Sequence, residues 1–176
     1  MSLHLRPGLL PPFARIKGKK TASTGPVLDP HGRKPSSAFS SGFRLVYLTL
    51  DYIFGYWLKI RPNIAKQPTV VIFDRYAYDM AIDPRRFRIA LPNKVIRWFT
   101  RLAPKPDLIF CLHGNPDVIV ARKRELPVAE VARQVDALKE FAANEPCAVL
   151  ISTEGSIQQA RDQVLNAIAN YCDKRA

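Results

Sequence analysis

The chain has 176 residues, of which 47% are hydrophobic, so it is long enough to bury a core and is not a disordered polypeptide. Lysine and arginine outnumber aspartate and glutamate by 27 to 15, and the net charge of +12 indicates a polyanionic partner, a phosphorylated ligand or an acidic surface. The three cysteines are widely spaced, which favours free thiols in a reducing compartment, here the cytoplasm, over a disulfide framework. The three histidines are scattered, which argues against a zinc site.

Residues 1–40 are rich in proline, glycine and basic residues and follow no period of 2 or 3.6. They predict a loop or an extended arm, in part disordered, ahead of an α/β domain over residues 41–176. The short apolar run 9–13 contains two prolines and does not fit a signal peptide. The apolar window 43–60 carries Arg44, Asp51 and Lys59, which favours a core helix over a membrane span.

The remaining elements follow in chain order. Ser40 or Ser41 is expected to cap a helix that runs to about Ala65, with a kink or a broken end at Pro62. Continuous apolar runs predict strands buried on both faces, and helices are expected between them. The expected strands cover 69–73, 107–112 and 148–152, and the expected helices cover 91–102, 115–124, 128–143 and 155–171. This alternation predicts a parallel sheet whose ligands lie at the carboxyl ends of the strands.

Charged residues stand directly after the first of these strands. Asp74 is suited to hold Mg²⁺ or to orient a phosphate-binding lysine, and Arg75 offers a planar fork for phosphate oxygens. A structural ion pair at the strand end explains the same two residues equally well. The arginines 85, 86 and 88 either grip a second phosphate or form a solvated basic loop.

Other candidates have similar alternatives. The basic run 122–124 ends a helix, where cations favour the helix dipole, but it could also close over a transferring phosphate. Glu130 and Arg133 are spaced to form an ion pair on their helix. Most aromatic residues of the long helix must be core residues, although Asp51 or Tyr52 could reach a base or a sugar.

Several segments together resemble the thymidylate kinase family of nucleoside monophosphate kinases. They are V-V-I-F-D-R-Y, then P-D-L-I-F-C-L with N-P-D-V-I-V-A-R-K-R-E-L, then V-A-E-V-A-R-Q, with Ile60-Arg61-Pro62 ahead of them. The resemblance covers about residues 43–172. It implies a P-loop kinase fold, with a three-layer parallel sheet that has helices on both faces. The implied activity is transfer of the γ-phosphoryl group of ATP, with Mg²⁺, to a nucleoside monophosphate or a similar acceptor.

The resemblance also implies roles for individual residues. Asp74 would serve the Mg²⁺–phosphate centre, Arg75 and Tyr76 would bind the acceptor, and Arg122 and Arg124 would be catalytic lid arginines. The resemblance places the ATP-binding group at Ser152, Thr153 and Ser156. Asp51, Tyr52, Arg85, Arg86 and Arg88 are further candidates for binding the acceptor on their residue types alone, because the loop 83–88 is not a standard feature of the family. The aromatic helix would supply a homodimer interface.

The chain departs from the family at its phosphate-binding loop, G-x-x-x-x-G-K-[ST], and at the strand before it. Neither Gly18-Lys19-Lys20-Thr21 nor residues 32–36 fits the motif, since Lys20 is displaced and Pro35 lacks an N–H. The sequence therefore predicts an impaired kinase that lost its first strand and loop through truncation, a misassigned start or divergence. Tyr52 and His113 differ from the family pattern, so the acceptor need not be dTMP.

Two other functions compete with this interpretation. A nucleotide- or phosphosugar-binding protein without catalysis would use the same residues. A nucleic-acid-binding module would account for the charge of +12, but no known reader motif is present, so we expect small-molecule ligands rather than nucleic acid.

Overall fold

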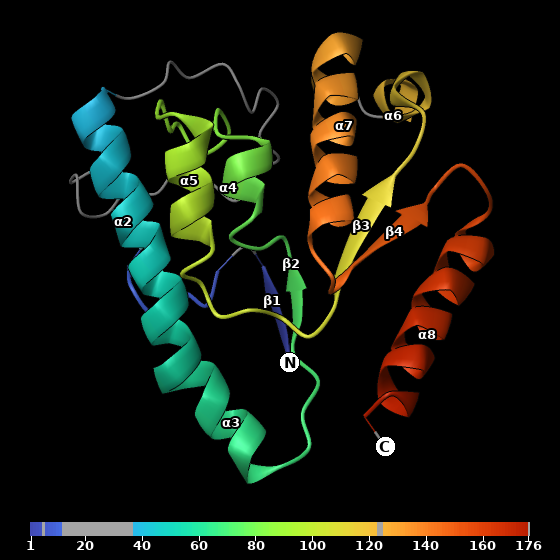
Figure 1. Cartoon of the computed structure of the whole chain (residues 1–176), viewed down its shortest axis with the longest axis horizontal. Coiled ribbons are helices and arrows are strands. Elements are labelled where there is room, and N and C mark those ends of the chain that lie inside the picture. The colour runs from blue at the N-terminus through green and yellow to red at the C-terminus, as the bar shows by residue number, and fades with distance from the viewer. Residues whose placement is uncertain (5, 12–36, 123–124, 176) are drawn as a thin grey trace. The chain divides into compact units, whose positions relative to one another are not determined.

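The computed structural model describes residues 1–4, 6–11, 37–122 and 125–175 (Figure 1). Most of the predicted arm, including both glycine–lysine segments, lies outside these residues, as does Arg124. The fold is mixed α/β and mostly helical, with two small two-stranded parallel sheets in the described residues. The chain divides into two compact units, Met1–Lys105 and Pro106–Ala176, and each is described by itself.

The first unit contains the sheet of β1 (Ser2–His4) and β2 (Ile72–Asp74), which pair in parallel with Ser2 opposite Ile72. A strand at residues 2–4 was not expected in the predicted arm. Its helices are α2 (Ala38–Gly55), α3 (Arg61–Lys66), the short α4 (Asp79–Ile82) and α5 (Asn93–Thr100). Helix α2 starts earlier than predicted, because the side chain of Ser37, rather than Ser40 or Ser41, accepts the capping hydrogen bond from the Ser40 N–H.

The long helix passes Pro62 without ending there. A π-helical turn, η1 (Tyr56–Ile60), joins α2 to α3, and the Arg61 N–H donates to the Tyr56 carbonyl group. Proline removes a backbone donor and its ring crowds the carbonyl group four residues earlier, and a wider turn relieves this crowding. The irregularity predicted at Pro62 is therefore a π turn just ahead of it, and the helical conformation continues to Lys66.

A buried cluster joins α2, α4 and α5 in the first unit. Its members are Leu45, Tyr52, Ala77, Met80, Ile89, Ile96 and Ala103. Leu45 and Ile96 are completely buried and belong to α2 and α5, which pack against each other. The cluster fixes the segment that follows β2 against the long helix.

Asp51 attaches the N-terminal segment to α2. Its side chain is completely inaccessible to solvent, and its carboxylate accepts hydrogen bonds from the N–H groups of Leu10 (2.6 Å) and Gly8 (3.3 Å). The Arg6 guanidinium lies 3.4 Å from the same carboxylate. Gly55, one turn further along, permits the close approach, since a Cβ atom there would lie 2.4 Å from the Cβ of Pro7.

The second unit contains β3 (Ile109–His113) and β4 (Ala148–Ser152), which pair in parallel over five residues from Ile109–Ala148 to His113–Ser152. Its helices are α6 (Pro116–Arg122), α7 (Val128–Asn144) and α8 (Ile157–Asp173). Helix α7 packs along both strands and α8 along β4 (Figure 1). These elements confirm the predicted strands and helices of this region to within a few residues.

Burial of the strands differs from the prediction. Val70 and Ile72, before and in β2, are 74% and 61% exposed, and Leu112 in β3 is 59% exposed. The expectation that the strands are buried on both faces is therefore wrong for these side chains. Among the described helices, none combines the length and hydropathy needed to cross a membrane, which agrees with the interpretation of residues 43–60.

We predict that Asp51→Ala lowers the free energy of unfolding by about 3 kcal/mol, because it leaves two partly buried hydrogen bonds and the Arg6 charge without their acceptor. Gly55→Ala should also destabilise the chain, since its new Cβ would collide with Pro7 without any change of charge. Urea denaturation measures both effects.

Gly42→Ala is the matched control on the same helix, because among the described residues no atom outside the neighbouring helical backbone lies within 4 Å of the Cβ that it would add. Alanine should be neutral or slightly stabilising there. An unfolding free energy of Asp51→Ala equal to that of the unchanged chain would show that residues 6–10 do not depend on this carboxylate.

Candidate functional site

The first candidate site lies at the carboxyl end of β2. Asp74 is the last residue of the strand and is exposed, and Arg75 follows it with a φ of +71°. This left-handed conformation costs a non-glycine residue about 1–2 kcal/mol. The Arg75 Nη1 lies 3.4 Å from the Asp79 Oδ2, and the Arg75 side chain remains 39% exposed. A cation is thus held at the strand end by a strained backbone and a partner carboxylate.

Asp79 was not identified from the sequence, although its position four residues after Arg75 is the spacing of a helical ion pair. Burial raises the pKa of the Asp79 carboxyl, and the positive charges of Arg75 and Arg86 offset this only in part. Asp83 follows nearby with 5% exposure and accepts a hydrogen bond from the Arg86 N–H. Asp79 and Asp83 thus both interact with Arg86, Asp79 through its charge and Asp83 through a hydrogen bond.

Tyr52 and Tyr76 are packed as core residues. Their rings meet edge to face at 4.9 Å, and Tyr76 also contacts Phe73 at 5.1 Å. The Tyr76 hydroxyl donates to the Pro104 carbonyl group, and burial raises the pKa of both phenols. These contacts, like those of Asp51, are structural, and a role of the three side chains in binding substrate stays a prediction.

The segment 83–90 is a built loop that packs on α2. The N–H groups of Phe87 and Ile89 donate to the Pro84 carbonyl group. The buried Ser41 hydroxyl accepts a hydrogen bond from the Ala90 N–H at 3.0 Å. Arg85 is exposed, whereas Arg86 and Arg88 are partly buried. The description of this segment as a solvated basic loop therefore holds for Arg85 but not for Arg88.

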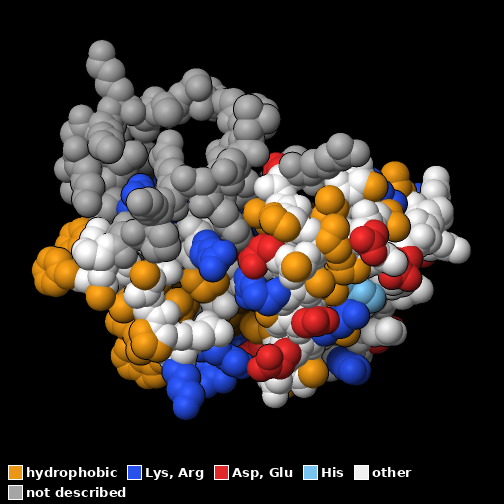
Figure 2. Space-filling view, turned by 90° about the horizontal axis from the view of Figure 1, so that it is seen from above, with side chains coloured by type: hydrophobic (Ala, Val, Ile, Leu, Met, Phe, Trp, Pro, Cys, Tyr) orange, Lys and Arg blue, Asp and Glu red, His pale blue; other side chains and the backbone are white. Residues whose placement is uncertain are grey.

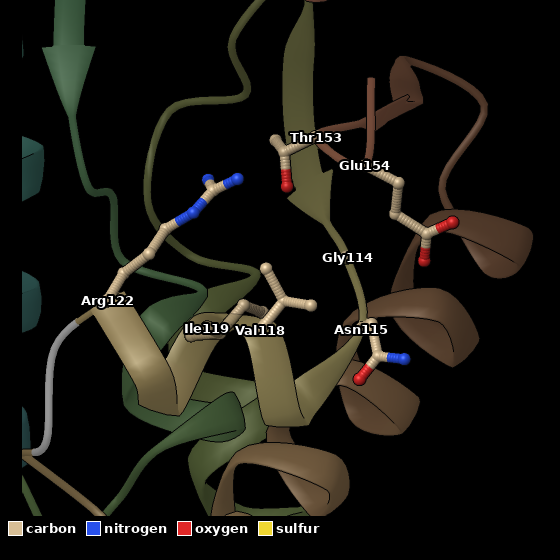
Figure 3. Close-up of a pocket in the computed structure, with 7 residues that line it drawn as sticks. All are labelled: Gly114, Asn115, Val118, Ile119, Arg122, Thr153 and Glu154. Carbon is tan, nitrogen blue, oxygen red and sulfur yellow. The ribbon is translucent and has the colours of Figure 1, made fainter. Parts of the chain in front are cut away.

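The second candidate site is a pocket of about 230 Å³ in the second unit, where β3 and β4 end (Figure 3). Seven residues line it: Gly114, Asn115, Val118, Ile119, Arg122, Thr153 and Glu154. The Thr153 N–H and hydroxyl both donate to the His113 carbonyl group, at 2.8 and 2.9 Å. Gly114 leaves room beside them, because a Cβ atom there would lie 2.7 Å from the Thr153 Oγ1.

The pocket brings two predicted residues together, Arg122 and Thr153. Figure 3 shows the Arg122 side chain reaching from the end of α6 toward Thr153. Ser152 and Ser156 do not line it. The Ser152 hydroxyl accepts from the Glu154 N–H, and Ser156 caps α8 in a capping box with Gln159. Gly114, Asn115 and Glu154 were missed, although Gly-Asn directly after a strand is a signal for a turn.

Glu130 and Arg133 form the ion pair on α7 that their spacing predicts, with 2.6 Å between Oε1 and Nη2.

The described residues also show how a metal ion could be bound. Within the described residues, no group of three or more histidine, cysteine, aspartate or glutamate side chains is arranged to hold a metal. An ion at Asp74 would therefore need ligands from a bound phosphate or from water, which is how Mg²⁺ is commonly bound.

Comparisons with protein-family models, with curated proteins and with solved structures found no match to this chain. The fold and the two sites define a mixed α/β protein with charged or polar groups at the ends of parallel strands. Its function is therefore inferred from its own residues.

We predict that Asp79→Asn raises the free energy of unfolding at pH 7 relative to the unchanged chain. A raised folded pKa means that the folded state prefers the neutral carboxyl group, so ionisation of Asp79 lowers stability as pH rises through that pKa. The difference between the two proteins should vanish below the unfolded pKa of about 3.9. Urea denaturation between pH 3 and 7 measures it, with the exposed Asp136→Asn as control. A difference that stays constant over this range would contradict the prediction.

Proposed function

We propose that the chain is a thymidylate kinase-like phosphotransferase, impaired because its sequence has no G-x-x-x-x-G-K-[ST] motif, and that its reaction is transfer of the γ-phosphoryl group of ATP to a nucleoside monophosphate or a similar phosphate acceptor. The main support is the end of β2, where the exposed Asp74 stands beside Arg75, whose backbone is held at a φ of +71°. Strained residues of this kind concentrate at functional sites. The proposal includes a P-loop kinase-like arrangement of a parallel sheet with helices on both faces.

The residues at the end of β2 divide the chemistry between them. The Arg75 guanidinium would bind the acceptor phosphate through two parallel hydrogen bonds. The Asp79 carboxylate, 3.4 Å from the Arg75 Nη1, would orient the guanidinium. The Asp74 carboxylate fits Mg²⁺ as one ligand among phosphate oxygens and waters, because it is exposed and stands at the strand end. Bound Mg²⁺ would neutralise charge on the transferring phosphoryl group.

The pocket of the second unit would bind part of ATP. Its volume of about 230 Å³ is below the range of about 300–1,000 Å³ typical of small-molecule sites, so it would hold one portion of the nucleotide. Arg122 carries a positive charge at its wall, suited to a phosphate group, and Thr153 supplies polar atoms. Arg122 would stabilise negative charge that develops during transfer.

A second candidate function is nucleotide or phosphosugar binding without catalysis. It is favoured by the sequence, in which no G-x-x-x-x-G-K-[ST] motif supplies a backbone cradle for the phosphates of ATP. A nucleic-acid-binding module remains the third candidate because of the charge of +12.

We predict that the chain binds Mg²⁺–ATP and a nucleoside monophosphate, with dTMP tested first, in separate isothermal titrations, and that a coupled assay detects slow phosphorylation of the acceptor, because the sequence has no phosphate-binding loop. Asp74→Asn should lower turnover at least about 100-fold while acceptor binding persists. Arg75→Asn should raise the Kd of the acceptor about tenfold, because asparagine tolerates the left-handed backbone but lacks the guanidinium. Asp136→Asn, an exposed acid on α7, is the control and should leave both values unchanged.

The outcomes separate the candidates. Acceptor binding that depends on Arg75, without turnover, would support a binding protein. Binding of neither nucleotide, together with a salt-dependent shift of DNA in a gel, would support the nucleic-acid module. Turnover unaffected by Asp74→Asn would overturn the roles proposed here.

The proposal also includes a homodimer formed through the long helix. Seven exposed apolar side chains follow each other at intervals of mostly three or four residues: Phe39, Phe43, Val46, Leu50, Phe54, Trp57 and Leu58. Figure 2 shows hydrophobic side chains gathered at the side of the molecule where α2 lies in Figure 1. This spacing forms a continuous seam, which suits the same seam of a second copy.

We predict that light scattering after size-exclusion chromatography gives twice the chain mass of 19.9 kDa. The double substitution Phe43→Glu and Leu50→Glu should give a monomer with an unchanged helical circular dichroism spectrum, because it places charges in the seam. Leu165→Glu is the control. Leu165 is also exposed but lies on α8, so this variant should remain dimeric. A dimer that survives the double substitution would place the interface elsewhere.

A further inference from the structure

We propose that the first unit carries a second anion site, formed by Arg44 of α2 and Arg88 of the loop 83–90, which binds a dianionic phosphate group. The site is distinct from the strand end at Arg75 and does not depend on phosphoryl transfer. Four observations support it: the linkage of the loop to the helix, the proximity of two cations, an unpartnered buried donor and a strained backbone.

Ser41 brings the two arginines together. Its buried hydroxyl lies 3.5 Å from the Arg88 carbonyl oxygen, to which it donates, and accepts from the Ala90 N–H at 3.0 Å. Arg44 follows Ser41 by three residues, so it lies on the same side of α2, about one turn further along. The loop is therefore attached to the helix at the place from which Arg44 extends.

The positive charge of Arg88 acts on the Arg44 guanidinium. Burial and, after it, the positive charge of Arg88 lower the pKa of Arg44. Like charges that are partly removed from water destabilise the fold unless an anion lies near them.

Arg88 has a buried donor without an acceptor. Its Nε is inaccessible to solvent, and the described residues supply no hydrogen-bond partner for it. Buried donors of charged groups are almost always paired in native proteins, by protein atoms, water or a ligand. The Asp83 carboxylate, the nearest acid along the chain, accepts instead from the Arg86 N–H.

The backbone at Arg88 is also strained, with a φ of +57°. Glycine or asparagine would adopt this conformation with less strain and without placing a second cation beside Arg44. Packing alone therefore gives no reason for an arginine here. Binding of a ligand by the Arg88 guanidinium would explain why arginine occupies this position.

The charges select the chemical class of that ligand. Two guanidinium groups match the double negative charge and the several acceptor oxygens of a phosphate monoester better than a single carboxylate. The shared chemistry is the phosphate group, whether it is free inorganic phosphate, a sugar phosphate or a nucleotide.

The test measures binding of inorganic phosphate by isothermal titration and by thermal shift, against chloride at equal ionic strength. The unchanged chain should bind phosphate and melt at a higher temperature in its presence. Arg88→Asn should raise the Kd about tenfold or more, since asparagine keeps the left-handed backbone and removes the charge. In phosphate-free buffer the same variant should melt at a higher temperature than the unchanged chain, because one of two repelling cations is gone.

Three further variants make the result specific. Arg88→Lys keeps the charge but loses the planar fork, so it should bind phosphate with intermediate affinity. Arg101→Gln removes an exposed arginine of the same unit and should leave binding unchanged. Arg75→Asn should also retain this phosphate site, which separates it from the acceptor site and keeps the inference independent of the proposed kinase activity.

Several results would overturn the inference. They are no binding of phosphate by the unchanged chain, equal affinity in Arg88→Asn and Arg101→Gln, or a lower melting temperature of Arg88→Asn in phosphate-free buffer with its phosphate affinity intact. If the site is present, competition by glucose 1-phosphate and by dTMP against inorganic phosphate identifies the source of the phosphate group.

Discussion

The buried carboxylate of Asp51 is the interaction on which the first unit depends. A carboxylate inside an apolar helix is unfavourable unless donors surround it, and here the donors come from the segment 6–10. Gly55 admits that segment against the same helix. The segment directly follows β1, which pairs with β2, and β2 ends at Asp74 and Arg75. A polar residue in the middle of α2 thus contributes to the position of the candidate site.

The second unit was largely predictable from the sequence. In the first unit the long helix, β2 and α5 were predicted, whereas β1 and α4 were not. Strands β3 and β4 are continuous apolar runs between helices with clear starts, such as Pro116 and the capping box at Ser156. Strand β1 has three residues and no period, and it pairs with a partner about 70 residues away. Its formation depends on tertiary contacts. The apolar runs also failed to predict burial, because a run of valine and isoleucine does not reveal what packs against each face.

The sites show the same division between local and tertiary information. The location of Asp74 and Arg75 was predictable because polar residues directly after a strand lie at its carboxyl end. The environment of Tyr52 was not, since an aromatic residue on a helix gives no sign of whether it faces a ligand or the core. The attachment of the loop 83–90 to α2 depends on Ser41, which hydrogen-bonds to backbone groups more than 40 residues away. No sequence period carries that contact.

Arg75 and Arg88 share a property that distinguishes them from the other cations of this basic chain. They are the non-glycine residues with positive φ in the part of the chain that the structure describes. Exposed lysines and arginines attract any anion weakly, and salt screens that attraction. A guanidinium that is held by a partner carboxylate, as Arg75 is by Asp79, or partly buried, as Arg88 is, loses less conformational entropy on binding than a freely moving one. The charge of +12 therefore divides into a diffuse part, which attracts anions, and a localised part at Arg75 and Arg88, which we propose selects phosphate groups.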